Sequence, residues 1–156
     1  MEKRLEELFN NSSLTVEELR NVFIKDLVPL VHGENLVGLD RGDVEHLMDG
    51  NNKFRLKIGT GVGESRAIDA IGDVLTKLGS VIEEADHARY LMYIEYGAED
   101  LMMDELVRVM NYFEEKVGNE VEMVWGAGRN DELGNQLEIL LLAGWKSLPE
   151  GFRSVI

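Results

Sequence analysis

Four short segments of this sequence have the alternating residue pattern of β-strands, near residues 54–58, 88–97, 120–126 and 136–143. Successive side chains of a strand point to opposite faces of a sheet, so a period of two indicates a strand. Between residues 89 and 96 both sets of side chains are mostly apolar, which predicts a strand in a largely covered sheet. Two segments between the strands, 65–78 and 100–117, repeat apolar residues at helical spacing. The predicted order is therefore strand, helix, strand, helix, strand, strand.

The helix predicted at 100–117 has signals at both ends. Asp100 is placed as its N-cap, and Gly118 follows as a stop signal. An apolar stripe along the helix is expected to be buried, and it consists of Met102, Leu106, Val109, Met110, Phe113 and Val117.

Residues 35–48 combine a loop of turn-forming residues with a short helix. Asp40 is placed as the N-cap, Asp43 falls at the third helical position, and Gly50 closes the helix. Both carboxylates then lie where free backbone N–H groups and the positive end of the helix dipole favour negative charge. On spacing alone, the two aspartates are interpreted as helix caps.

Another helix is predicted at 15–31. Thr15 and Glu18 form a capping box at its start, and an apolar stripe that includes Leu19, Phe23 and Leu27 follows. Because a lone amphipathic helix of this length is marginal in water, we expect the stripe to pack against the rest of the domain.

Charge and composition argue against several classes of function. The chain has 156 residues, a formal net charge of −14 and no cysteine. Binding nucleic acid requires a basic face, so no nucleic-acid partner is expected. The lack of cysteine excludes thiolate metal sites and fits a cytoplasmic setting. No apolar run is long enough to span a membrane and no export signal opens the chain, so no membrane insertion is expected.

No cofactor or metal site is recognisable in the sequence. The glycine-rich run at 59–63 lies between a strand and a helix, but it lacks the Lys-Ser/Thr of a Walker loop and the spacing of a dinucleotide site. His32, His46 and His87 share no helical face with a second metal ligand. No Ser-His-Asp or Cys-His arrangement is present either. We therefore expect no cofactor, no metal and no nucleotide binding by this chain alone.

The segment at 35–48 resembles a loop of the cell-division GTPase FtsZ. Asn35-Leu-Val precedes Gly38-x-Asp40-x-x-Asp43, which is similar to the family's Asn-x-Asp-x-x-Asp loop and likewise continues into a helix. Gly38 stands where the family has asparagine. In that family the two acids reach into the nucleotide site of the next subunit and position the water that attacks GTP.

The likeness extends over about residues 3–145. It is strongest at 121–144, where a strand, a small-residue turn, an Asp-Glu-Leu segment and a closing strand follow the family's pattern. Gly59, Gly61, Arg66 and Ala67 match an element that forms a structural turn in the family, whereas its Gly-Gly-Gly-Thr-Gly-Thr-Gly nucleotide signature is absent. Residues 15–31 resemble the long central helix of FtsZ, so the chain begins about where the family's nucleotide-binding domain ends.

The resemblance implies an α+β fold of the FtsZ/tubulin C-terminal-domain type. This is a two-layer sandwich, a four-stranded mixed sheet with the two helices on one face, plus N-terminal helices. The expected divisions are N-terminal helices at 1–33, the FtsZ-like domain at 34–147 and a short tail at 148–156.

The resemblance also implies a site. Asp40 and Asp43 would act as catalytic acids in trans, within an interface formed by Asn35, Gly38, Asp40 and Asp43. The implied partner is an FtsZ-like GTPase subunit or another copy of the chain. A second hypothesis is a stand-alone protein-interaction module that kept the fold and lost the filament and GTPase role. A third, an enzyme in its own right, has no support beyond surface acids.

Overall fold

The structure, a computed structural model, describes residues 17–18, 21, 35–37, 41–79, 88–118 and 121–146. The strands are β1 (Asn35–Val37), β2 (Lys53–Val62), β3 (Arg89–Tyr96), β4 (Glu122–Arg129) and β5 (Gln136–Trp145). The helices are α4 (Arg41–Met48), α5 (Arg66–Leu78), α7 (Met103–Val117) and the one-turn 3₁₀ helix η2 (Asp131–Leu133). The order of long elements predicted from the sequence is confirmed.

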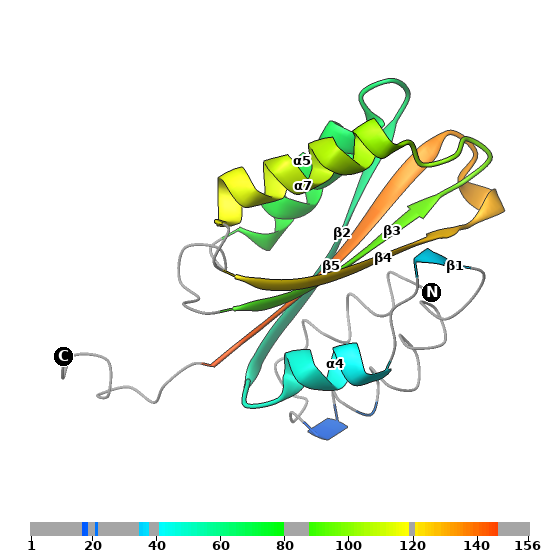
Figure 1. The fold of residues 1–156 in the computed structure, drawn as a ribbon. Coiled ribbons are helices and arrows are strands. Elements are labelled where there is room, and N and C mark those ends of the chain that lie inside the picture. The colour runs from blue at the N-terminus through cyan, green and yellow to red at the C-terminus, as the bar shows by residue number, and fades with distance from the viewer. Residues whose placement is uncertain are drawn as a thin grey trace.

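One sheet contains all the described strands, in the spatial order β1-β4-β3-β5-β2 (Figure 1). The neighbouring strands β3 and β4 are parallel, whereas β5 is antiparallel to both β3 and β2. The predicted four-stranded mixed sheet is therefore confirmed for the four long strands. Short β1 is added to it at the β4 edge, opposite Ala127 and Gly128.

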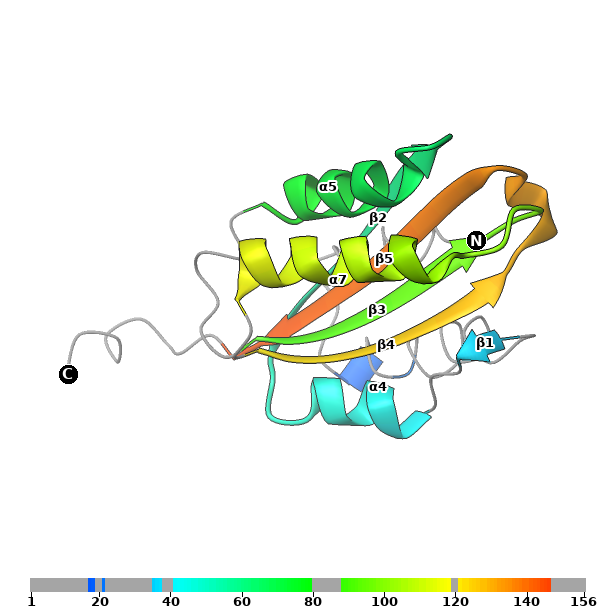
Figure 2. The same ribbon diagram turned by 45° about the horizontal axis from the view of Figure 1, so that its top comes forward.

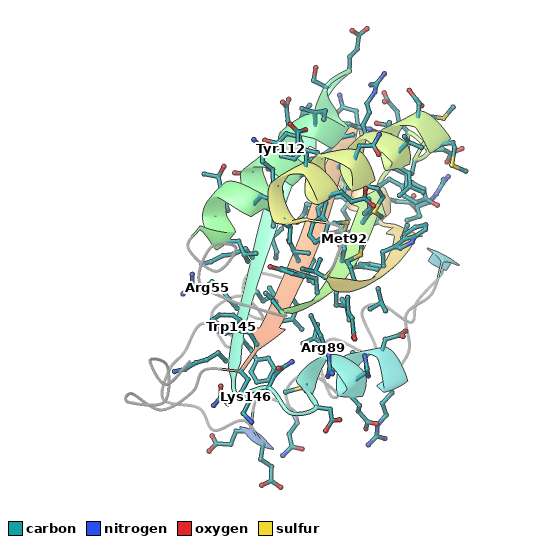
Figure 3. The ribbon with its side chains drawn as sticks, turned by 60° about the vertical axis from the view of Figure 1, so that its left-hand side comes forward. Arg55, Arg89, Met92, Tyr112, Trp145 and Lys146 are labelled. Atoms are coloured by element: carbon teal, nitrogen blue, oxygen red, sulfur yellow. The ribbon has the colours of Figure 1, made fainter. Side chains whose placement is uncertain are left out.

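The main core lies between this sheet and two helices, as predicted. Figure 2 shows α5 and α7 side by side over one face of the sheet. In this core the rings of Tyr90 and Phe113 meet edge to face, with centroids 5.3 Å apart. Figure 3 shows Met92 pointing from β3 toward these helices. The alternate residues of β3, such as Leu91 and Tyr93, are buried on the opposite face, so β3 is covered on both faces.

Two glycines in β2 let α5 approach the sheet closely. A Cβ atom on Gly59 would lie 2.4 Å from the carbonyl oxygen of Ala70, and one on Gly61 would lie 2.1 Å from that of Arg66. The run at 59–63 was predicted as a turn, but β2 continues through it to Val62. The prediction was wrong because glycine has a low strand propensity, whereas these glycines are required by the close packing of α5 and not by a turn.

Arg66, at the start of α5, joins the two helices through a buried ion pair. Its Nε and Nη2 atoms lie 2.7 and 2.9 Å from the two carboxylate oxygens of Glu105 on α7. Its Nη2 also donates to the carbonyl oxygen of Asp100 at 2.8 Å. The hydrogen bond from Arg66 holds the pKa of the Glu105 carboxyl below its usual value, and Glu105 in turn raises the pKa of Arg66. The sequence matched Arg66 to a structural turn of the FtsZ family, and in the structure Arg66 joins α5 to α7.

The start of α7 differs from the prediction. The helix begins at Met103, and the Asp100 carboxylate pairs with Arg129 instead of capping the helix. Met102 was expected in the buried stripe, but it precedes the helix and its side chain is 57% exposed. The rest of the stripe is confirmed: Val109 and Phe113 are buried, and Leu106, Met110 and Val117 pack against the core.

Strand β4 also exceeds its predicted end near residue 126, because it continues to Arg129. The helix expected at 15–31 and the tail at 148–156 lie outside the described residues, apart from residues 17, 18 and 21. Within the described ranges, no helix is long and apolar enough to cross a membrane.

Candidate functional site

Helix α4 carries the one predicted site acid that the structure describes, Asp43, in its first turn. The helix lies across the sheet from α5 and α7 (Figure 1), and it buries Val44, Leu47 and Met48. Leu47 packs closely on β5, since a Cβ atom on Gly144 would lie 2.7 Å from Leu47 Cδ2. The short helix is therefore fixed by packing, since eight residues alone would not hold a helix in water.

Arg89, the first residue of β3, holds the other end of α4. Figure 3 shows its side chain extending over that helix. Its Nη1 atom donates to the carbonyl oxygens of His46 and Asp49, at 2.6 and 2.9 Å. A guanidinium at this position satisfies carbonyls that have no partner within the helix and complements the negative end of the helix dipole. The amide of Asn51 adds a bond of 2.6 Å to the carbonyl oxygen of Leu47.

Glu122, the first residue of β4, completes a cluster with Arg89 and His46. Its Oε2 atom lies 2.8 Å from His46 Nε2 and 3.3 Å from Arg89 Nε. The hydrogen bond with His46, together with the positive charge of Arg89, holds the pKa of the Glu122 carboxyl below its usual value. The cluster links α4 to the first residues of two neighbouring strands, so α4 is held at both its apolar face and its C-terminus.

A pocket of about 300 Å³ adjoins this cluster. We call it the α4 pocket, and its lining consists of Asp43, His46, Leu47, Arg89, Tyr90, Glu122, Met123 and Val124. Leu47 and Val124 give it an apolar floor, and the charged residues form its rim. Tyr90 and Met123 border it from the strands, since their side chains pack in the core on the other face of the sheet. In that core, burial raises the pKa of Tyr90 to about 12. Such a pocket accepts an apolar group that carries a polar or charged neighbour.

The four predicted site residues are placed as follows. Asp43 is half-buried at the rim of the α4 pocket. Asn35 lies in β1, opposite Gly128 of β4. Gly38 and Asp40 lie outside the described residues, so the pairing of Asp40 with Asp43 remains a prediction. Among the described residues no group of acids or histidines could hold a metal ion.

Sequence reasoning missed His46, Arg89 and Glu122 as a group. They come from α4, β3 and β4, and between 33 and 76 positions separate them along the chain. No short motif connects them. One signal was available: Arg89 and Glu122 each lie near the start of a predicted strand, and the first residues of two parallel neighbours meet at the same end of a sheet.

The chain matches no family model, but it has relatives among curated proteins. FtsZ 2 of Pyrococcus furiosus, a cell division protein, is 25% identical over 126 residues, and FtsZ of Methanothermobacter thermautotrophicus is 26% identical over 141 residues. The alignments cover 81% and 88% of this chain but 31% and 36% of those proteins. The chain therefore spans about a third of the length of the curated relatives it matches.

Solved structures agree on the fold. An FtsZ dimer of M. jannaschii matches with a TM-score of 0.64 at 22% identity, over 92% of this chain and 43% of that one. CetZ from Methanosaeta thermophila matches with a TM-score of 0.56 at 18% identity, over 86% of this chain and 37% of that one. The homologues of this chain are FtsZ proteins, and its fold is that of the FtsZ/tubulin C-terminal domain.

Proposed function

We propose that this chain contacts the nucleotide face of an FtsZ-like filament subunit through its Asp40/Asp43 loop, in cell division or a related cytoskeletal role. The partner is an FtsZ-like GTPase subunit or another copy of a protein containing this domain. The chain supplies carboxylates to the partner's site and binds no GTP itself.

One observation carries the proposal: Asp43 projects from a helix that is held on two sides. Its carboxylate lies in the first turn of α4, while Leu47 packs under Gly144 and Arg89 binds the carbonyls at the helix end. A group that positions a water for attack on a phosphate must keep its orientation, and rigid support from packing and hydrogen bonds provides that.

The α4 pocket gives the same surface a means of association. Its apolar floor lies beside Asp43, so a side chain of the partner could be buried there while Asp43 faces the nucleotide. Interfaces depend on a few side chains buried in such pockets, surrounded by polar contacts that exclude water. The apolar floor would serve binding and the Asp43 carboxylate would serve GTPase stimulation, so mutations can separate the two effects.

The proposal is tested with a full-length FtsZ-like GTPase from the same source. At substoichiometric ratios the wild-type chain should bind the exposed nucleotide face at one filament end, shorten the filaments and change phosphate release. Asp43→Asn should keep binding but lose any stimulation of GTP turnover, because an amide cannot replace the charge of the water-positioning carboxylate. Asp40→Asn should do the same with a small loss of helix stability.

Glu45→Gln is the matched control. Glu45 is exposed on the same helix and pairs with Arg41 at 2.9 Å, so its neutralisation removes one charge from α4 without touching the α4 pocket. It should leave filament length and phosphate release unchanged. If the wild type alters neither quantity, the proposed contact is wrong. Binding without any effect on turnover would favour the interaction-module hypothesis.

A further inference from the structure

The end of the sheet farthest from the α4 pocket contains a second, larger hollow. We call it the acidic groove; it has a volume of about 600 Å³ and lies between the first residues of α5 and α7. The α4 pocket takes residues from the start of β3, whereas the acidic groove includes Glu99 and Asp100, which follow the end of β3. Eight strand residues at about 3.3 Å each separate the two sites by roughly 25 Å.

Negative charges predominate in the acidic groove. Five carboxylates and two arginines line it, which gives a net charge of −3. Arg66 is committed to Glu105, and Arg108 lies 3.5 Å from Asp104. Glu99 reaches Arg66 only at 3.9 Å and its side chain is 66% exposed. Glu64 forms no ion pair within the described part of the chain. Glu64 and Glu99 are therefore the carboxylates with most capacity for an external cation.

Exposed apolar side chains gather at the same end. Five large apolar residues are exposed in the described ranges: Val62, Ile68, Met102, Met103 and Val107. All of them lie at the end of β2 or near the starts of α5 and α7. Met102 lines the acidic groove, and Val62 directly precedes Gly63 in its lining. The described α4 end has no comparable residue. A soluble chain that exposes its large apolar residues in one region has a binding surface there.

We propose that the acidic groove binds a basic amphipathic segment of a partner protein. Lysine or arginine side chains of that segment would meet Glu64 and Glu99, and its apolar side chains would pack on Met102 and Val62. Methionine is flexible and polarisable, so it adapts to apolar partners of different shapes. The charge selects the class of partner, because the same surface repels nucleic acid and acidic proteins. The proposal does not depend on the function assigned to α4.

Binding is tested with two fluorescent synthetic peptides of the same lysine and leucine composition. One places its leucines on a single helical face, and the other is scrambled so that no apolar face forms. Anisotropy titrations of the full chain should give a dissociation constant at least about tenfold lower for the amphipathic peptide, because only that peptide can use Met102 and Val62. Equal binding of both peptides would reduce the interaction to non-specific attraction by a chain of net charge −14 and would overturn the proposal.

Variants locate the site. Glu64→Gln with Glu99→Gln should weaken binding of the amphipathic peptide about tenfold, and Met102→Ser with Val62→Thr should do so to a similar extent. The matched control is Glu114→Gln with Glu115→Gln, which removes the same charge from exposed positions near the other end of α7. It should change the affinity by less than about twofold. A control that weakens binding as much as Glu64→Gln with Glu99→Gln would refute the assignment.

Two further measurements keep the result unambiguous. Amide chemical shifts of the unmodified chain should change on peptide addition at residues 63–66 and 99–104, and a change centred on α4 would contradict the proposal even if a variant failed to fold. Sedimentation without peptide should give the same mass for wild type and for the Met102 and Val62 variant. If the substitutions abolish self-association instead, the occupant is a second copy of the chain and the proposed basic partner is wrong.

Discussion

The two ends of the sheet differ in where they place apolar and charged side chains. In the α4 pocket the apolar residues form a floor, and His46 and Arg89 of the rim both contact Glu122. In the acidic groove the one large apolar lining residue, Met102, is exposed, and carboxylates outnumber arginines by five to two. A preformed apolar floor favours one geometry of contact. An exposed methionine beside a net negative charge instead favours any partner that combines basic and apolar side chains. If both proposals hold, one small domain combines a rigid contact with an adaptable one.

The largest effect is expected when the support of the acidic groove is removed. Arg66→Met leaves Glu105 buried without its guanidinium partner, and breaking a buried ion pair in this way costs about 3–5 kcal/mol of unfolding free energy. Urea unfolding measures the loss. The double variant Arg66→Met with Glu105→Leu should recover most of it, because no buried charge is left without a partner. A loss under about 1 kcal/mol in the single variant would mean that the pair does not hold this end together.

A backbone substitution at the same end should have the next largest effect. Gly61→Ala places a Cβ atom 2.1 Å from the carbonyl oxygen of Arg66, so α5 must shift, at a cost of about 1–3 kcal/mol. Gly72→Ala is the matched control, because its Cβ would have Tyr112 Oη as its nearest neighbour, at 3.6 Å. That variant should be stabilised by up to about 1 kcal/mol, since alanine is the better helix former. Thermal melts of both variants would show opposite signs; equal signs would contradict the packing argument.

At the α4 end a smaller loss is expected from Arg89→Ala. The variant loses two hydrogen bonds to the end of α4 and the contact with Glu122, which we expect to cost about 1–2 kcal/mol because Arg89 is partly solvated. Arg41→Ala removes only an exposed pair with Glu45 and should cost about 0.5 kcal/mol or less. If the proposed function is right, Arg89→Ala should also weaken GTPase stimulation, because Asp43 loses its fixed helix. Normal stimulation by this variant would show that α4 needs no support from β3.

The smallest effect is a difference in acid sensitivity. The folded-state pKa of Glu105 and that of Glu122 are both lowered. Each group therefore stabilises the fold above its unfolded pKa, about 4.3, and this stability is lost as the pH falls through the folded-state value. Glu105 is buried and Glu122 is exposed. Glu105→Gln should therefore flatten the stability profile below about pH 5 more than Glu122→Gln does. The reverse order, measured by urea unfolding from pH 3 to 7, would contradict the comparison of the two ends.

Much of the fold could be predicted because local patterns and packing agree. Strand alternation and helical stripes located all four long strands and both covering helices, and residues such as Phe113 were correctly assigned to the core. The errors lie where tertiary contacts override local signals. Gly61 resembles a turn residue but serves close packing, and Asp100 resembles an N-cap but pairs with Arg129. Met102 fits the helical period, yet α7 begins only after it.

The candidate site was predictable only in part. Asp43 was identified from its place in a motif, which is a local property. The groups that hold its helix in place, Arg89 and Glu122, come from distant strands, and their meeting depends on the parallel pairing of β3 and β4. The acidic groove likewise consists of residues that are distant in sequence, because it joins the β2–α5 turn to the β3–α7 loop. Surfaces assembled from several chain segments are visible only once the topology is known.

The position of β5 between β2 and β3 also determines when this domain can fold during synthesis. Strand β5 is the last strand of the described chain, yet it pairs along its whole length with β2, whose residues are translated some 74 to 92 positions earlier. Until β5 leaves the ribosome, the facing edges of β2 and β3 have no partner strand between them. Pairings of such long sequence separation form slowly, and open strand edges favour aggregation. The nascent domain is therefore most prone to aggregation just before strand β5 is complete.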